Sequence, residues 1–373
     1  MTLLTRAASS AKLRAAIIGH TGHGNYGHDH DLIFKGRENI EVAAVTDPDE
    51  AGRAKAVSRS EALRSYADYG EMLAKEKPDL LCIAPRWTDQ HHAMAMAGLQ
   101  AGAHLYVEKP FTQTLAEADE ILAEARKRRR KIVVAHQMRL APNILQLKQS
   151  REQGFLGELL AIRAHGKQDS RAGGEDLIVL GVHLFDLMRF FAGDPQWCTA
   201  RVLQDGHEIT LADARPATEK IGPVAGNDIT AEFAFPNGLR GGFASRAKYR
   251  EAAGPWGMEL LGSKRSAKIL MEMVPRIYVL EPGAWAGQAR ADQWRPWPED
   301  PTLKWPESAR SLAAANARVV DEWLAAIAQD REPECGGEAG MRAFEMAMAV
   351  FAAGLARTRV EIPLARRQHP LGA

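Results

Sequence analysis

The sequence predicts an α/β protein with two domains: a doubly wound parallel sheet covered by helices on both faces, then an α+β domain built on an open, mainly antiparallel sheet. Three observations predict this. Apolar runs alternate with helical patterns in the first third, a glycine-rich turn follows the first run, and several strand-like runs follow residue 140. A chain of 373 residues suits two domains, which we place at 1–137 and 138–373.

The first domain is predicted from short apolar runs that have the length of buried strands. They lie at 15–18, 42–45, 80–83, 105–107 and 132–134. Between the last two, apolar residues repeat with helical spacing from Leu115 to Ala125, and Thr114 with Glu117 forms a capping box before them. Strands that alternate with helices pair in parallel, so both faces of this sheet should be covered.

The second domain is predicted from a turn at 154–157, a strand over 160–167 and a helix over 181–192. Pro236-Asn237-Gly238 has the composition of a hairpin turn. The segment 281–307 is rich in Pro, Trp and Gly, and we expect an ordered loop there. Further strands are expected at 197–203, 229–235, 239–245, 258–261 and 276–280, and closing helices at 311–329 and 338–358.

The charge balance excludes several classes of protein. Lys plus Arg is 48 and Asp plus Glu is 47, so no global field attracts nucleic acid. The basic run 127–131 ends a predicted helix, where cations favour the dipole. The three cysteines form no CxxC pair, which argues against a disulfide framework or a zinc ribbon. We see no signal peptide and no membrane span, and therefore expect a cytoplasmic protein with no nucleic-acid or membrane partner.

A glycine-rich loop carries the first functional signal. Gly22-x-Gly24-x-x-Gly27 follows the strand 15–18 and precedes a predicted helix. Glycines let the backbone approach a pyrophosphate, which a helix N-terminus then binds. Gly19 or Gly22 is the first functional glycine. Asp47 ends the second strand, where a carboxylate accepts hydrogen bonds from ribose hydroxyls and repels a 2′-phosphate, so residues 1–137 are predicted to be an NAD-binding Rossmann domain.

Histidine is also frequent in this loop. His20, His23, His28 and His30 alternate with Asp29 and Asp31, a composition that can bind a metal. Metal ligands packed around a pyrophosphate would compete with it. We therefore interpret these side chains as polar loop and cap residues and predict no metal site.

Glu108-Lys109-Pro110 follows the strand 105–107. The carboxyl ends of parallel strands face the ligand in a doubly wound sheet. An ammonium there would stabilise a developing alkoxide or transfer a proton, and Pro110 would lock the turn, with a cis peptide as one option. The alternative is a surface lysine paired with Glu108.

Taken together, these motifs resemble the family of glucose–fructose oxidoreductase and myo-inositol dehydrogenase. The resemblance rests on 79–85, His91, 101–110, Arg139 with Pro142, 154–157, 181–186 and Asn237-Gly238. It implies a Rossmann domain followed by an open-faced sheet domain, NAD or NADP chemistry on sugars or cyclitols, and Lys109 and His183 as catalytic residues. From the loop and these motifs, the expected NAD contacts are Gly19, Thr21, Gly22, Gly24, Asn25, Tyr26, Asp47, Pro85, His91, Glu108 and Lys109.

His183 lies three residues before Asp186 near the start of the predicted helix, and an imidazole suits proton transfer near neutrality. The alternative is a buried core histidine. Many members of the family have an aspartate four residues before this histidine, where this chain has Val179. Glu175 or Asp176 is a possible substitute, although spacing alone does not show it.

Arg163, His165 and Lys167 alternate along the first strand of the second domain and so share one face. This face is either a site for an anionic substrate or a charged face between subunits. The expected substrate contacts are Arg139, Arg163, His165, Lys167, Asp176 and His183.

The sequence thus predicts an oxidoreductase that transfers a hydride between a sugar or cyclitol hydroxyl or ketone and the nicotinamide of NAD. Two alternatives stay open: a redox-neutral glycoside hydrolase that uses NAD for transient oxidation, and a non-catalytic NAD or ligand sensor. The partner is a small polyhydroxylated substrate, with an anionic one as an option. Because an open sheet must cover its second face, we also expect a homodimer or homotetramer.

Overall fold

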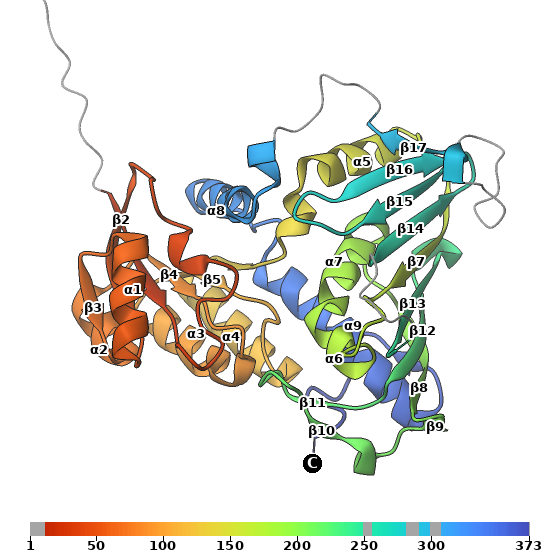
Figure 1. The fold of residues 1–373 in the computed structure, drawn as a ribbon, viewed down its shortest axis with the longest axis horizontal. Coiled ribbons are helices and arrows are strands. Elements are labelled where there is room, and N and C mark those ends of the chain that lie inside the picture. Colours follow the sequence, from red (N-terminus) through yellow and green to blue (C-terminus); the bar gives the residue numbers. More distant parts are fainter. Residues whose placement is uncertain (1–11, 249–255, 281–290, 299–306, 373) are drawn as a thin grey trace, which may run out of the picture.

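The computed structural model describes residues 12–248, 256–280, 291–298 and 307–372. Figure 1 shows the N-terminal domain on the left and a large sheet on the right, with α7 (Gly181–Ala192) and α9 (Gly337–Ala356) between them. The predicted two-domain α/β architecture is confirmed.

The first domain is a six-stranded parallel sheet in the order β3-β2-β1-β4-β5-β6. Five of its strands coincide with the predicted apolar runs because those residues are buried from both faces, whereas the edge strand β3, which is largely exposed, was not predicted. The strands are β1 (Leu13–Ile18), β2 (Ile40–Thr46), β3 (Arg64–Tyr66), β4 (Leu80–Ile83), β5 (His104–Val107) and β6 (Ile132–Val134), and the helices are α1 (Glu50–Ser60), α2 (Tyr69–Glu76), α3 (His91–Gln100) and α4 (Leu115–Arg128). The capping box that starts α4 is confirmed, with both reciprocal hydrogen bonds present.

The prediction of a helix directly after the glycine loop is wrong. Residues 19–39 are all described, and they form turns with one short 3-10 helix, η1 (His30–Leu32). Gly27 (φ +55°) and Asp29 (φ +56°) adopt left-handed backbone conformations, which interrupt an α-helix. No α-helix N-terminus therefore follows the third glycine.

The second domain is built on a ten-stranded sheet whose main path is β17-β16-β15-β14-β7-β13-β12-β8-β18, with β9 paired to β8. Among the described strand pairs of this sheet, only β7–β13 is parallel, so the mainly antiparallel sheet is confirmed. The strands are β7 (Leu159–His165), β8 (Trp197–Gln204), β9 (His207–Glu208), β12 (Asp228–Ala234), β13 (Arg240–Arg246), β14 (Gly257–Gly262), β15 (Ser266–Leu270), β16 (Arg276–Leu280), β17 (Trp294–Trp297) and β18 (Val360–Glu361), with β10 (Arg215–Pro216) and β11 (Pro223–Val224) in a separate hairpin.

The sequence did not predict β15 and β17. Within the segment 281–307, residues 291–297 form η6 (Ala291–Gln293) and β17, while most of the predicted loop lies outside the described residues. The hairpin turn at Pro236–Gly238 (η5) between β12 and β13 is confirmed.

Helices cover the face of the large sheet that looks toward the first domain (Figure 1). Phe185 of α7 packs against Phe233 and Phe243, with ring centroids 5.4 and 5.0 Å away. α9 is long and apolar enough to cross a membrane by length and composition, but 72% of its apolar window is buried inside the protein. The remaining helices are α5 (Pro142–Glu152), α6 (Gly174–Val179), α8 (Leu312–Ala328), η2 (Thr88–Gln90), η3 (Gln137–Leu140), η4 (Leu211–Asp213) and η8 (Glu307–Arg310).

The hydrophobic core of the first domain also contains residues from a late segment of the chain. Trp323 of α8 is fully buried in the first domain's core, 6.2 Å from the Tyr106 ring and 6.4 Å from the Phe34 ring. A helix that follows β17 of the second domain thus completes the Rossmann core.

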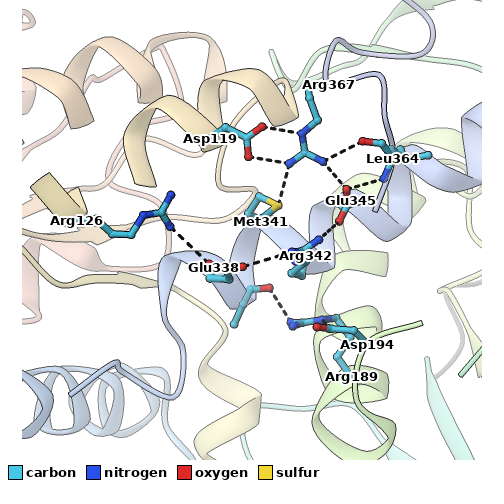
Figure 2. Close-up of polar contacts among 11 residues, drawn as sticks. Asp119, Arg126, Arg189, Asp194, Glu338, Met341, Arg342, Glu345, Leu364 and Arg367 are labelled. Carbon is cyan, nitrogen blue, oxygen red and sulfur yellow. Dashed lines mark hydrogen bonds and ion pairs between the residues drawn. The ribbon is translucent and has the colours of Figure 1, made fainter. Parts of the chain in front are cut away.

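A polar cluster ties α4 of the first domain to α9 and to the C-terminal tail (Figure 2). Arg367 donates to both carboxylate oxygens of Asp119, at 2.6 and 2.8 Å, and also to Glu345. Glu345 is fully buried and accepts further hydrogen bonds from the Leu364 amide (3.0 Å) and Arg342 (2.9 Å). The tail therefore connects the two domains through one guanidinium group.

Candidate active site

Lys109 lies just beyond the carboxyl end of β5, in a turn whose Lys109–Pro110 peptide is cis. The side chain is 7% exposed, and its Nζ donates to the main-chain oxygen of Val179 at 3.4 Å. Burial lowers the pKa of Lys109 from its ordinary value, against the attraction of Glu108 and Glu219. An ammonium that is easier to deprotonate than usual is suited to exchanging a proton with a substrate oxygen.

His183 is buried in the first turn of α7. Burial lowers the pKa of His183 well below its ordinary value, and the nearby Lys109 charge adds to the effect. Its Nδ1 is buried and has no hydrogen-bond partner among the described residues. A neutral imidazole with one free nitrogen can bond a substrate hydroxyl.

Val179 stands where many members of the family have an aspartate, and its main chain still contacts Lys109. The Val179 carbonyl, not an acidic side chain, contacts Lys109. Asp176 instead accepts from Ser245 Oγ at 2.7 Å, and burial raises its pKa to about 6. Glu175 accepts hydrogen bonds from the amide and hydroxyl of Thr218. The contacts of these two acids are thus directed at Ser245 and Thr218, not at Lys109.

Arg139, expected to contact substrate, is engaged by Asp186. Its Nε and Nη2 donate to the buried carboxylate at 2.7 to 3.1 Å. Burial opposes ionisation of Asp186, but the Arg139 charge holds its pKa below the usual range. These two donors are therefore used within the protein, in the pairing of Arg139 with Asp186.

His136 is a candidate that the sequence interpretation missed. It is buried two residues after β6, and its ring centroid lies 5.4 Å from that of His183. Its Nδ1 lies 3.4 Å from Asp186 Oδ1, an ion-pair distance without hydrogen-bond geometry. Its position just beyond a parallel strand is the sequence signal that could have identified it.

Glu108 is fully buried and faces two histidines of the glycine loop. His28 Nδ1 donates to Glu108 Oε1 at 2.8 Å, and His30 Nδ1 lies 3.3 Å from Oε2 without hydrogen-bond geometry. Burial opposes ionisation of Glu108, but the His28 and His30 interactions hold its pKa below the usual range. Burial lowers the pKa of His30 to about 4.

The glycine loop is shaped by close approaches. A Cβ at Gly24 would lie 2.6 Å from the Trp87 nitrogen, and one at Gly27 would lie 2.6 Å from the Ala84 oxygen. The Tyr26 ring fills the space beside Gly19, whereas Gly22 (φ +79°) faces open space. Asn25 Oδ1 accepts from the Gly22 amide at 3.0 Å, which braces the turn.

Asp47 ends β2 as expected but is capped by the loop. Its carboxylate accepts hydrogen bonds from the Thr21 amide, the Thr21 hydroxyl (2.7 Å) and the Asp49 amide (3.0 Å). Tyr26 is mostly buried nearby, and burial together with the Asp47 charge raises the pKa of its hydroxyl. Thr21 and Asp47 therefore form one rigid polar group beside the loop.

His91 braces the loops of the first domain. The ring is fully buried, and its two nitrogens lie 3.0 Å from the Phe111 oxygen and 2.7 Å from the Pro85 oxygen. Both polar atoms of the imidazole thus face backbone. The imidazole therefore positions the segments that carry Pro85 and Phe111.

The basic strand residues are not gathered at Lys109. Arg163 is exposed on β7, paired with Gly242 on one side and Glu259 on the other, and it points to the face opposite α7. His165 shares that alternation, and Lys167 follows the strand. The substrate role expected for Arg163 does not fit this position, because the catalytic candidates lie on the helix-covered side.

Other charged residues, which the sequence interpretation missed, do gather near Lys109. Glu219 lies 3.7 Å from Arg86 and 4.0 Å from Arg171, and all three influence the pKa of Lys109. Arg86 Nε is buried without a partner in the described part of the chain. Among the described residues, no group of three or more His, Cys, Asp or Glu side chains is arranged to hold a metal ion.

Two family models match this chain. One, described as an oxidoreductase family with an NAD-binding Rossmann fold, covers residues 13–136. The other, described as the C-terminal alpha/beta domain of the oxidoreductase family, covers residues 152–362.

The individual relatives that match this chain share less than a third of its residues over the aligned region. An uncharacterized oxidoreductase of Synechocystis is 26% identical over 87% of this chain and 89% of its own length. The dehydrogenase aclE of Aspergillus oryzae is 29% identical over 50% of this chain, a match that spans only 56% of that relative. A levoglucosan dehydrogenase solved with NADH and levoglucosan has the same fold, with a TM-score of 0.74, 18% identity and coverage of 94% of this chain and all of that one. The chain belongs to the oxidoreductase family of glucose–fructose oxidoreductase, inositol dehydrogenase and MocA, and is an NAD-dependent oxidoreductase.

Proposed function

We propose that this enzyme moves a hydride between a carbinol carbon of a sugar or cyclitol and the nicotinamide of NAD. The observation that carries the proposal is the burial of both Lys109 and His183, with Lys109 Nζ bonded to the carbonyl of Val179, four residues before His183. The similarity to enzymes named inositol 2-dehydrogenase, D-glucoside 3-dehydrogenase and levoglucosan dehydrogenase supports a polyhydroxylated substrate.

NAD, when bound, would supply the nicotinamide that accepts the hydride. In oxidation, Lys109 in its neutral form takes the hydroxyl proton, and the buried ammonium so formed stabilises the oxygen as its negative charge develops. His183 orients the same hydroxyl through its free Nδ1. Burial of both groups strengthens these interactions, because little water competes for them.

The glycine loop fits a dinucleotide. Gly22, Gly24 and Gly27 all have positive φ, and open space at Gly22 makes it, instead of Gly19, our choice for the first glycine of the motif. Asp47 disfavours a 2′-phosphate nearby, and the hydroxyl of Thr21 lies beside it. The NAD contacts that we retain as proposals are Thr21, Gly22, Gly24, Asn25, Asp47, Pro85 and Glu108.

An anionic substrate remains part of the proposal but through different residues. Arg86 and Arg171 share the single carboxylate of Glu219 at distances longer than a hydrogen bond. A substrate carboxylate would satisfy these cations better, because bidentate pairing with arginine is short and charge-assisted. A uronate or aldonate is therefore the preferred test substrate.

The test is incubation with NAD and a panel of levoglucosan, myo-inositol, D-apiose, glucuronate and aryl glucosides. NADH absorbance supports the dehydrogenase, and each of Lys109→Ala and His183→Ala should then lose about a hundredfold or more in kcat while melting normally. Aglycone release without NADH would identify a redox-neutral glycoside hydrolase. Binding without either product would identify a sensor.

We also propose that a second copy covers the outward face of the large sheet. This face carries both signs of charge, with Arg163 and Arg201 beside Glu232 and Glu259, so it can pair with itself around a two-fold axis. Light scattering at micromolar concentration should give a dimer or tetramer, and a monomeric mass would contradict it. The free, buried cysteines Cys82, Cys198 and Cys335 suit the reducing cytoplasm, which we retain as the proposed location.

A further inference from the structure

The histidine-rich loop contains a group that the reaction has not used. His28 follows the last glycine of the loop, and its side chain is 35% exposed. Its Nδ1 donates to Glu108 Oε1 at 2.8 Å, and the same Oε1 lies 3.9 Å from Lys109 Nζ. The three groups thus form a line from a partly exposed imidazole, through a fully buried carboxylate, to the buried ammonium.

Lys109 has no comparable exposed partner of its own. Its side chain is 7% exposed, and Glu108 is fully buried. Each turnover nevertheless moves one proton between substrate oxygen and solvent. We propose, on the basis of the proposed dehydrogenase function, that His28 and Glu108 relay this proton between Lys109 and solvent.

The proton balance is clearest for ketone reduction. The carbonyl carbon receives the hydride, and the Lys109 Nζ–H bond breaks as the substrate O–H bond forms. The His28 Nδ1–H bond then breaks as a Glu108 Oε1–H bond forms, and this Oε1–H bond breaks in turn as the Lys109 Nζ–H bond forms again, which returns Glu108 to the carboxylate. Solvent protonates His28 Nε2, and exchange with solvent restores the starting tautomer. Oxidation runs the same steps in reverse.

The surrounding charges are consistent with this route. Glu108 remains a carboxylate between turnovers, because its neighbours hold its pKa below the usual range, so it carries the proton only in transit. The 3.9 Å gap to Lys109 is longer than a hydrogen bond, and one bridging water or a small approach on substrate binding closes it. The charged and titratable groups that face this line are His30, Arg86, Arg171, His183 and Glu219.

The position of His28 is itself supported from outside the first domain. Asn316 of α8 is buried and donates to the His28 main-chain oxygen at 2.8 Å, and it accepts from Gln137 at 3.0 Å. These bonds fix the backbone, and the ring is left to contact Glu108. A loop residue held this firmly is suited to a relay, which requires constant distances.

The test is His28→Asn, whose amide can still donate to Glu108 but cannot pass a proton on. We expect kcat to fall at least tenfold, with unchanged KM for NADH, and added imidazole to restore it. His92→Asn is the matched control, because His92 is 32% exposed and contacts Glu120 at the same 2.8 Å, but on the surface of α3. It should keep full activity and show no response to imidazole.

A second measurement is independent of turnover. In Lys109→Met, the NMR ring signals of His28 should shift at pH 7 while those of His92 stay in place. Wild-type kcat in His28→Asn, or weaker NADH binding as its only defect, would overturn the relay even if the wild-type enzyme is an active dehydrogenase. If the wild-type enzyme oxidises nothing in the panel, the NMR measurement still tests the relay: His28 signals that do not shift in Lys109→Met would overturn it.

Discussion

Single residues near the active site divide into those left available for chemistry and those already bonded within the protein. Lys109 has one long contact to a carbonyl, and His183 has a free nitrogen. Arg139 and His91, by contrast, have their polar atoms directed at other protein atoms. Both groups are buried to a similar extent, so hydrogen-bond partners, and not burial, distinguish the proposed catalytic residues from the residues bonded within the protein.

Arg139→Met should therefore destabilise the protein more than it affects substrate binding. The substitution leaves the Asp186 carboxylate buried beside only His136, and breaking such a pair costs roughly 3–5 kcal/mol. Urea denaturation measures this loss. Arg126→Met, at an exposed position on α4, is the control and should change stability by no more than about 0.5 kcal/mol. A stable Arg139→Met enzyme with a raised substrate KM would return Arg139 to the substrate site.

At the scale of elements, the glycine loop works by close packing against the segment that follows β4. Gly24 touches the backbone of Arg86 and Trp87, and the Arg86 amide donates to the Gly24 oxygen at 3.1 Å. The loop that we propose to bind the cofactor is thus held against the segment that carries Pro85, even though no α-helix directly follows the loop.

Gly24→Ala and Gly22→Ala separate packing from backbone strain. Both glycines have similar positive φ values, +85° and +79°, so both substitutions carry the left-handed strain of about 1–2 kcal/mol. Only the Gly24 methyl group would also collide with backbone atoms, which adds about 1–3 kcal/mol. We expect a clearly lower Tm and weaker NAD binding for Gly24→Ala. Equal effects of the two substitutions would show that this packing is unimportant.

At the scale of the whole molecule, the two domains are joined by late segments of the chain. α8 completes the first core, α9 lies between the domains, and the tail carries Arg367 to Asp119 (Figure 2). Relative motion of the domains must therefore strain contacts made by the last part of the chain.

Arg367→Ala should weaken this connection. It removes charge-assisted hydrogen bonds to Asp119 and Glu345, each worth about 1.5–3 kcal/mol, although Arg342 still neutralises Glu345. Calorimetry should show a Tm lowered by several degrees. Arg276→Ala removes an exposed pair with Glu272 at 2.8 Å and should cost about 1 kcal/mol at most. If the two variants melt alike, Arg367 is only a surface pair.

Acid should destabilise the tail through His369. Burial lowers the pKa of His369 to about 4, whereas an unfolded histidine has a pKa near 6.5. The unfolded chain then binds the extra proton first, so stability is complete above pH 6.5 and is lost as pH falls toward 4, by about 1.4 kcal/mol per pKa unit. In His369→Asn, the amide oxygen can still accept from the Leu371 amide but cannot titrate. Urea denaturation at pH 7 and pH 5 should show a smaller difference for the variant; an equal difference would assign the acid sensitivity to other histidines.

The sequence by itself determined the local elements and the family. Apolar runs of strand length, the Thr114–Glu117 capping box and the hairpin at Asn237 each depend on neighbours in the chain, so their periodicity and turn chemistry are legible without a structure. The motif around Lys109 identified the proposed catalytic lysine for the same reason. The strands β15 and β17 were missed because they pair across a sheet and have little pattern of their own.

Only the tertiary structure decided which side chains share a site and which are already bonded. Arg139 was paired by Asp186, 47 residues away, and His28 was brought to Glu108 across 80 residues. Arg163 was turned to the outward face by the register of its strand. The helix expected after Gly27 was lost because the packing of the loop holds Gly27 and Asp29 in left-handed conformations. Contacts between distant segments depend on how the sheets and helices pack, and that packing leaves no periodic signal in the chain.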